Sequence, residues 1–467
     1  MSTRYRAYAP EQPHLLPSAP QDWMPQDHLA YLVRDVARAL DLSAIHRWYF
    51  KDPRGAPPFD PLMMVSLLLY AWCSDIYSSR KMAMLCVGDL GGRYLAAGEQ
   101  PDFRTLSTFR LQHGEALADL FVQSVRLCQT AGMVSLGHVA VDGTKLAANA
   151  SKRKAMSYGR MVRTEADLRA EIAEIQRRSQ SEDAAEDTLF GKDNSGFDLP
   201  KELKFRQTRL ARILEAKAQL EAEVRQAAEA KAAEREAKRP KSGTDPYGDD
   251  GKPRRGRKPK DPATVVPKEK AQRGFTDPES RIMKSGAGEW VQGYNGQAAV
   301  DCDNQVIVAC DLTNMAADAP HLQPLMDQVS QNTGAVPTEM SADAGYFSAE
   351  NVQSQTTPYS QPYIAPDRMK HGRQQTPVLQ DIDDAELSVA DRMRKLLSTP
   401  DGRDAYANRM KTVEPVFGQI KGCPGSPGFR QFLRRGLTKA RQEWRWQCAT
   451  HNFLKYMRHQ MTAPSVV

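Results

Sequence analysis

Residues 138–150 read HVAVDGTKLAANA, and the fold prediction starts from this stretch. Its alternating, β-branched character predicts a strand, a tight turn at Asp142-Gly143, and a second short strand. A carboxylate at a strand end points in a fixed direction, and the adjacent glycine lets a ligand approach the backbone closely. Asp-Gly is also among the commonest turn dipeptides, so Asp142 alone does not distinguish a functional site from an ordinary turn.

The second half of the chain has an α/β pattern. Residues 290–301 (WVQGYNGQAAVD) and 305–311 (QVIVACD) predict an antiparallel strand pair. A helix over about 320–331 follows. Next come a strand that ends in SADAGYFS, with Asp343 at its carboxyl end, a further helix, and a strand over 362–365. This order is consistent with a ribonuclease-H-like fold that is interrupted after its first strand.

The first part of the chain, residues 1–132, is predicted to be mainly helical. The apolar run at 61–72 (PLMMVSLLLYAW) is too short to span a bilayer and predicts a buried helix. No basic segment followed by an apolar core begins the chain, and the seven cysteines contain no CxxC pair. These features predict a cytoplasmic protein without a membrane partner.

Residues 101–113 (PDFRTLSTFRLQH) predict a helix with Thr105 or Ser107 as its N-cap. Arg104 and Arg110 would then lie near the start of the helix. Such an arrangement is compatible with the second helix of a helix-turn-helix, whose first residues face base edges. It is also compatible with an ordinary corner of a helical bundle.

Between the two halves, residues 152–238 are charged and predict a long helical hairpin. Residues 238–277 have the composition of a linker, rich in Pro, Gly, Lys and Arg. Within the linker, PRRGRKPK at 253–260 carries Arg255 and Arg257 and resembles an AT-hook, an arm that lies in a narrow minor groove. The alternative is a solvated basic linker.

A third carboxylate, Glu414, precedes Pro415, which suits the first turn of a helix. Lys421 would lie two turns further along the same face. The chain as a whole has a net charge of +7 and a pI of about 8.9, which suits a polyanionic partner without establishing one.

Several of these segments together carry a family resemblance. The motifs VDGTKLAANAS, GFTDPESRIMKSGAGEWVQGYNGQAAVD, ADAGYFS and VEPVFGQIK, with Tyr406 and Arg409 ahead of the last, resemble the DDE transposases of bacterial insertion sequences. PFDPLMMVSLLLYAW and PDFRTLSTFR resemble the helical DNA-binding domain that precedes the catalytic domain. The resemblance implies an N-terminal domain over 1–132 and a ribonuclease-H-like catalytic domain over 133–460. A hairpin and basic linker over 160–275 would be inserted in the catalytic domain.

The resemblance further implies that Asp142, Asp343 and Glu414 hold two Mg²⁺ ions, for which Mn²⁺ would substitute. Two such ions supply charge neutralisation and an activated nucleophile for phosphodiester cleavage. The DNA partners would be the terminal inverted repeats of an insertion sequence and a target DNA. A homodimer or larger assembly would hold the two ends together in the bacterial cytoplasm, associated with the nucleoid.

Tyr406, Arg409 and Lys421 are expected around the third carboxylate, where the two cations would contact DNA phosphates. The family spacing is Tyr, two residues, Arg, three residues, Glu, six residues, Lys. In this chain four residues separate Arg409 from Glu414, which affects the role of Arg409 more than that of Lys421. Two alternatives remain open: a transposase-derived DNA-binding protein without catalysis, and a nuclease or recombinase of the same fold.

Overall fold

The computed structural model describes residues 20–49, 57–151, 154–190, 201–237, 261–286, 288–353, 360–367, 382–422 and 427–462. They belong to two compact units, and each is described by itself. The sheet unit comprises Met1–Ala147, Ser285–Ala287 and Tyr294–Val467, and the hairpin unit comprises Ala148–Lys284 and Gly288–Gly293. No described helix is both long and apolar enough to cross a membrane.

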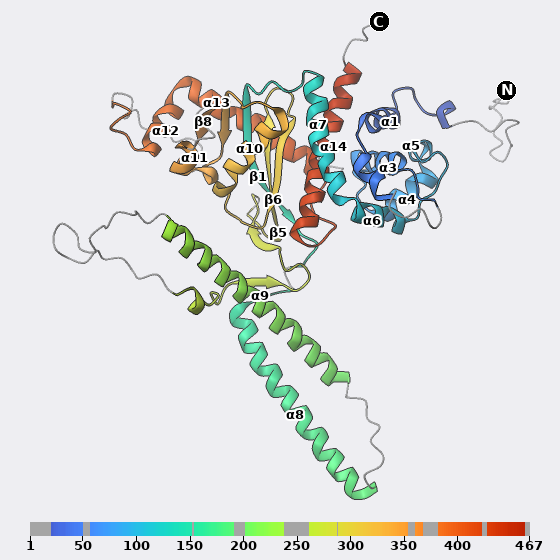
Figure 1. Ribbon diagram of the computed structural model, residues 1–467, viewed down its shortest axis with the longest axis vertical. Helices are drawn as coiled ribbons and strands as arrows, with labels where there is room; N and C mark the ends of the chain where they lie inside the picture. The colour runs from blue at the N-terminus through green and yellow to red at the C-terminus, as the bar shows by residue number, and fades with distance from the viewer. Residues whose placement is uncertain are drawn as a thin grey trace, which may run out of the picture. The chain divides into compact units, whose positions relative to one another are not determined.

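A mixed sheet forms the centre of the sheet unit (Figure 1). Its strand order is β6-β5-β1-β7-β8, and the start of β5 also pairs with β4 within the hairpin unit. β1, β7 and β8 are parallel, whereas β5 and β6 are antiparallel. The amide of Cys302 donates to the carbonyl of His138, so the end of β5 meets the start of β1. The strands are β1 (His138–Ala147), β4 (Arg281–Lys284), β5 (Trp290–Asp301), β6 (Ile307–Thr313), β7 (Glu339–Ala342) and β8 (Gln361–Ile364).

The predicted antiparallel pair, and the strands before and after Asp343, are confirmed. The predicted turn at Asp142-Gly143 is wrong, because β1 runs without a break from His138 to Ala147. β4 was not predicted. The α/β class is confirmed as a mixed α/β structure.

The described part of residues 1–132 is helical, as predicted. α3 is almost completely buried, and its N-cap Asp60 accepts the amide of Leu62 at 2.7 Å. α6 begins earlier than predicted: Asp102 is its N-cap and accepts the amide of Arg104 at 2.6 Å, in place of Thr105 or Ser107. The helices are α1 (Leu29–Ala39), α2 (Ser43–Tyr49), α3 (Pro61–Cys73), α4 (Ser79–Gly88), α5 (Leu90–Leu95), α6 (Phe103–Gln112) and α7 (Gly114–Thr130).

Helices from the C-terminal half cover the sheet. α14 packs along α7 and β6, α10 contacts β6, and α13 contacts β1, β7 and β8. Trp444 of α14 is fully buried and Trp446 is 5% exposed, so both tryptophans are core residues. The helices are α10 (Leu322–Thr333), α11 (Ala349–Gln353), α12 (Val389–Ser398), α13 (Pro400–Lys421) and α14 (Leu437–Thr462).

α13 differs from the prediction in its start. It begins at Pro400, capped by Thr399, so Glu414 and Pro415 lie in the helix interior and not in its first turn. Proline lacks the amide hydrogen that would bond to the carbonyl four residues earlier, here Lys411. The side-chain amide of Gln305 donates to that carbonyl at 3.2 Å and satisfies it. This substitute donor helps to explain how the helix continues through Pro415.

The hairpin unit contains α8 (Tyr158–Phe190) and α9 (Lys201–Ala237), which pack against each other as predicted. The expected linker is wrong for part of its length. Residues 261–277 include a short 3₁₀ helix and the strand β3 (Gln272–Gly274), which pairs with β2 (Ala155–Ser157). A small apolar core joins these elements; its buried members are Met156, Met161, Leu168, Ile213 and Ala216.

Candidate active site

The register of two parallel strands brings Asp142 and Asp343 together. β1 pairs with β7 from His138 opposite Glu339 to Val141 opposite Ala342. Asp142 and Asp343 are the next residue on each strand, so they occupy neighbouring positions at the end of the ladder. Residues in register on parallel strands direct their side chains to the same face. The structure therefore pairs two of the three predicted carboxylates.

Both oxygens of the Asp142 carboxylate have partners. Oδ1 accepts the amide of Gly143 at 2.7 Å, and Oδ2 accepts Nη1 of Arg409 at 2.8 Å. The side chains of Asp142 and Arg409 are only 18% and 13% exposed. Burial raises the pKa of Asp142 to about 6; Arg409 opposes the shift, and the nearby charge of Asp343 adds to it.

Gly143 is required for space and not for a turn. A Cβ atom at this position would lie 2.7 Å from Nε2 of Gln297, 2.9 Å from Oδ1 of Asp318 and 3.0 Å from Oδ1 of Asn295. Because real Cβ atoms do not approach other atoms so closely, a larger residue here would displace the side-chain ends of Gln297 and Asp318. This close contact is the physical reason that the Asp-Gly pair occurs within a strand.

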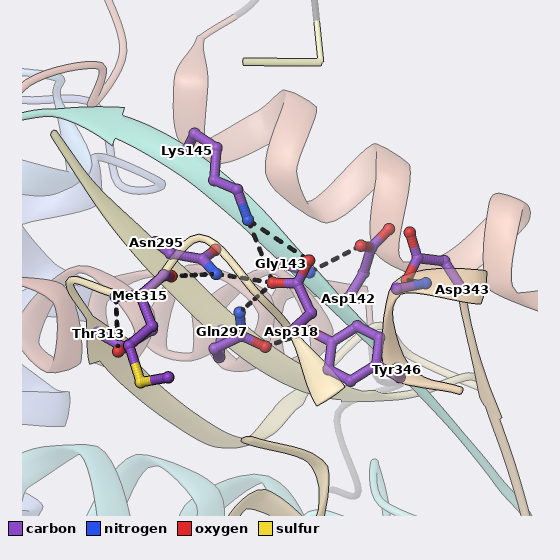
Figure 2. A network of polar contacts seen from close by, with 11 residues as sticks. Asp142, Gly143, Lys145, Asn295, Gln297, Thr313, Met315, Asp318, Asp343 and Tyr346 are labelled. Atoms are coloured by element: carbon purple, nitrogen blue, oxygen red, sulfur yellow. Dashed lines mark hydrogen bonds and ion pairs between the residues drawn. The ribbon is translucent and has the colours of Figure 1, made fainter. Parts of the chain in front are cut away.

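Asp318 is the centre of a polar network that the sequence analysis missed (Figure 2). Its Oδ1 accepts hydrogen bonds from Asn295 at 2.7 Å, from Gln297 at 2.9 Å and from the ammonium of Lys145 at 3.1 Å. Gln297 in turn accepts the hydroxyl of the fully buried Tyr346. This network connects β1, β5 and the segment that follows β7.

Asp318 and Asp343 line the same narrow space. A Cβ atom added at Gly345 would lie 3.0 Å from Oδ1 of Asp343 and 3.2 Å from Oδ2 of Asp318. Asp343 also caps the short 3₁₀ helix at Ala344–Tyr346 by accepting the amide of Gly345 at 2.9 Å. One signal for Asp318 was present in the sequence: Asn295 and Gln297 are polar residues two positions apart on a strand, and both are fully buried.

Of the predicted residues on α13, Arg409 contacts Asp142 directly and also lies beside Tyr406. The guanidinium of Arg409 lies 5.7 Å from the ring centre of Tyr406. Burial lowers the pKa of Arg409, but Asp142, Tyr406, Asp343 and Glu414 outweigh this effect, so the pKa is raised. All three predicted carboxylates therefore act on this one cation.

Glu414 and Lys421 occupy the later part of α13. The side chain of Glu414 is exposed, while Lys421 is half-buried. Burial lowers the pKa of Lys421, the cations Arg430 and Lys145 lower it further, and Asp142 opposes the shift. Among the described residues, no three His, Cys, Asp or Glu side chains lie close enough together to hold a metal ion.

The predicted DNA contacts outside α13 have different outcomes. Arg104 is exposed at the start of α6. Arg110 is buried: its guanidinium pairs with Glu443 at 3.2 Å and lies 5.4 Å from the ring centre of Trp72. The interpretation of Arg110 as a DNA contact is therefore corrected to a structural ion pair. Arg255 and Arg257 lie outside the described residues.

Comparison with protein families identifies two matching stretches. Residues 18–112 match the family described as Transposase domain (DUF772), and residues 369–457 match the Transposase DDE domain. The two matches support a DDE transposase of the insertion-sequence type. No curated protein and no solved structure matches the transposase.

The two matches cover different parts of the chain. The DDE match includes Tyr406, Arg409, Glu414 and Lys421, all on α13 of the transposase. The DUF772 match extends through α6. Asp142 lies outside both stretches, as do Asp318 and Asp343.

Proposed function

We propose that this transposase binds the terminal inverted repeats of its insertion sequence, cleaves the DNA there, and joins the freed 3′ ends to target DNA. The observation that carries the proposal is the register that makes Asp142 and Asp343 neighbours at the end of the β1–β7 ladder. Around them are the cations Lys145, Arg409 and Lys421, of which Arg409 pairs directly with Asp142.

We infer that the sheet is that of a ribonuclease-H-like domain. In chain order its strands are β1, β5, β6, β7 and β8, and the second strand runs antiparallel to the first. β6 pairs with β5, and β7 and β8 continue the sheet on the other side of β1. The domain would span 133–460, with residues 160–275 inserted after its first strand. Residues 1–132 would form the DNA-binding domain, and exposed Arg104 near the start of α6 would contact DNA.

The donor chemistry of the site suits a divalent metal ion, which DDE transposases typically use. Carboxylate oxygens are the ligands that Mg²⁺ prefers, and one or two carboxylates with waters and substrate phosphate are sufficient. Asp142, Asp343 and Glu414 would hold two Mg²⁺ ions, with Mn²⁺ as a substitute. When bound, such ions neutralise charge on the scissile phosphate and lower the pKa of an attacking hydroxyl.

The protein's own residues would orient the carboxylates and the DNA. Asp318 holds Lys145 and the amides of Asn295 and Gln297, which fixes the wall of the site. Arg409 keeps Asp142 in place through a buried ion pair, and Lys421 lies on α13, where it can reach a phosphate oxygen. The site is thereby arranged around charge, as phosphoryl transfer requires.

The test uses DNA that carries the inverted repeats of the element. Wild type should cut at the repeat boundary with Mg²⁺ or Mn²⁺ and not with EDTA, and it should join the cut end to a target plasmid. Asp343→Asn should bind the repeats without cutting them. Asp327→Asn, an exposed aspartate on α10, serves as the matched control and should cut normally.

One observation favours a second candidate, a DNA-binding protein without catalysis. Glu414 is exposed and does not form a three-carboxylate cluster with Asp142 and Asp343. If wild type binds the repeats and never cuts them with either metal, this second function replaces the first. If it cuts but does not join ends to the target, the protein is a nuclease of the same fold.

A further inference from the structure

The hairpin unit contains a pocket that the proposed catalytic chemistry does not use. Its volume is about 640 Å³, and it opens between the first half of α9, the segment before β2 and the segment after β3. A pocket of this size is in the range that accommodates a small organic ligand or a nucleotide. The residues that characterise its lining are Lys154, Lys204, Phe205, Arg209, Arg212 and Phe275.

Four cations line this pocket without any described carboxylate among its walls. Lys204, Arg209 and Arg212 are exposed along α9, and Lys154 is exposed beside β2. None of the four forms an ion pair with a described residue. Like charges gathered in one pocket raise its positive potential and attract an anion.

Some other cations of the same unit pair with carboxylates. Arg206 pairs with Glu171 at 2.7 Å, and Lys217 pairs with Glu165 at 2.8 Å. Arg206 lies within the same stretch of α9 as the pocket cations. Carboxylates of the hairpin therefore pair with some of its cations, whereas the four pocket cations form no ion pair among the residues that the structure describes.

An exposed aromatic ring accompanies the charges. Phe205 is 67% exposed, and it stands on a helix that is rich in charged residues. The pocket lining also has an apolar part, since Met156 and Ile213 are buried core residues and Phe275 packs against their cluster. A ring beside a cationic groove is the combination that binds single-stranded nucleic acid, because bases stack on the ring while cations contact the phosphates.

We propose that this pocket binds a DNA strand, with Lys154, Lys204, Arg209 and Arg212 on the phosphates and Phe205 against an unpaired base. The proposal rests on the proposed function, because DNA is the polyanion that a transposase handles. It adds a second DNA-binding site to the protein, on the inserted hairpin and separate from the carboxylates of the sheet unit. An acidic protein segment would satisfy the charges but would leave no specific need for an exposed phenyl ring.

The experiment measures DNA binding by full-length protein with fluorescence anisotropy. The probe is a short labelled duplex with a single-stranded tail, and each affinity is measured over a range of salt concentrations. Arg209→Gln/Arg212→Gln should weaken binding about tenfold or more and reduce the salt slope by about 1.4, at about 0.7 for each lost contact to a single strand. Arg225→Gln/Lys231→Gln makes the same charge change on exposed positions of α9 outside the pocket and should leave both values near wild type.

The ring is tested separately. Phe205→Ala should weaken binding of the tailed probe about fivefold or more, the lower end of what one stacked base contributes. It should affect a blunt duplex less, and Phe205→Tyr should retain tight binding because the ring is kept. Circular dichroism should show that each variant keeps its helical content.

The outcomes separate the two proposals. If the Arg209/Arg212 variant binds like the Arg225/Lys231 control while wild type binds DNA, the pocket proposal is wrong and the proposed function is unaffected. If wild type binds neither probe, both proposals fail. If the pocket variants change the oligomeric state in light scattering and leave DNA affinity unaltered, the occupant is another copy of the chain, and the pocket proposal is overturned.

Discussion

Replacing Asp318 tests whether its network positions the active site. The change Asp318→Asn keeps the size of the side chain and removes its charge. In the wild-type protein, Oδ1 of Asp318 accepts hydrogen bonds from Asn295, Gln297 and Lys145 at 2.7, 2.9 and 3.1 Å. The Lys145 ammonium also lies 3.5 Å from Oδ2 of Asp318. An amide in this place puts an NH₂ group where Oδ2 stands and leaves the Lys145 charge without a counterion.

The expected magnitude follows from those contacts. A hydrogen bond to a charged group contributes about 1.5–3 kcal/mol, and a bond between neutral groups about 0.5–1.5 kcal/mol. The loss is therefore about 1 kcal/mol for each of three bonds, and relief of the buried charge reduces the total. We expect the free energy of unfolding to fall by about 1–3 kcal/mol, and cleavage to fall about 10–100-fold as for residues that orient metal ligands.

Two assays check this expectation. Urea unfolding gives the stability change, and cleavage of inverted-repeat DNA over a Mg²⁺ titration gives both the rate and the metal requirement. Asp327→Asn, with its exposed side chain on α10, should match wild type in both assays. If Asp318→Asn is destabilised but cleaves at the wild-type rate with the wild-type Mg²⁺ requirement, Asp318 stabilises the fold without positioning the site, and the reasoning is refuted.

Three further changes have defined outcomes. Gly143→Ala forces a Cβ to within 2.7 Å of Gln297, so cleavage should fall at least about tenfold while circular dichroism stays unchanged; normal cleavage would contradict the tight approach. Burial lowers the pKa of His451 to about 4, against about 6.5 when unfolded, so the unfolded state binds more protons between these values and stability falls as pH drops through that window. Because of His451, the free energy of unfolding of the wild type should be about 2 kcal/mol lower at pH 5 than at pH 7.5. Urea unfolding of His451→Gln should show a correspondingly smaller fall between these two pH values. Gln305→Ala removes the donor to the Lys411 carbonyl and should lower the unfolding free energy by about 1 kcal/mol; an unchanged value would mean that water replaces the side chain.

The secondary structure around the site was largely predictable, because alternation and turn residues are local signals. The strand before Asp343 and the pair formed by β5 and β6 followed from them. Gly143 was misinterpreted because Asp-Gly is a turn signal in isolation. Its true role depends on Gln297 and Asp318, which lie more than 150 residues away in sequence and carry no local mark of that contact.

The roles of single side chains were less predictable. Arg110 has the position expected of a DNA contact on α6, but Glu443 at the far end of the chain determines that it is buried. Glu414 was assigned to a first turn because Pro415 follows it. The sequence gives no sign that Gln305 donates a hydrogen bond to the Lys411 carbonyl, so the continuation of α13 through Pro415 could not be inferred. Asp318 was missed because its hydrogen-bond donors come from β1 and β5 and not from its own segment.

The packing of α7 on α14 has a consequence for synthesis of the chain. Cys128 and Asn452, which touch across these helices, are 324 residues apart, and the buried partner of Arg110 also comes from α14. Contacts at such separation form late and leave apolar surface uncovered until then. The N-terminal helices therefore cannot complete their packing on the ribosome before α14 has emerged. A premature stop codon anywhere upstream of α14 would remove the surface on which α7 folds. A truncated gene is therefore expected to yield a polypeptide for degradation and not a stable N-terminal fragment.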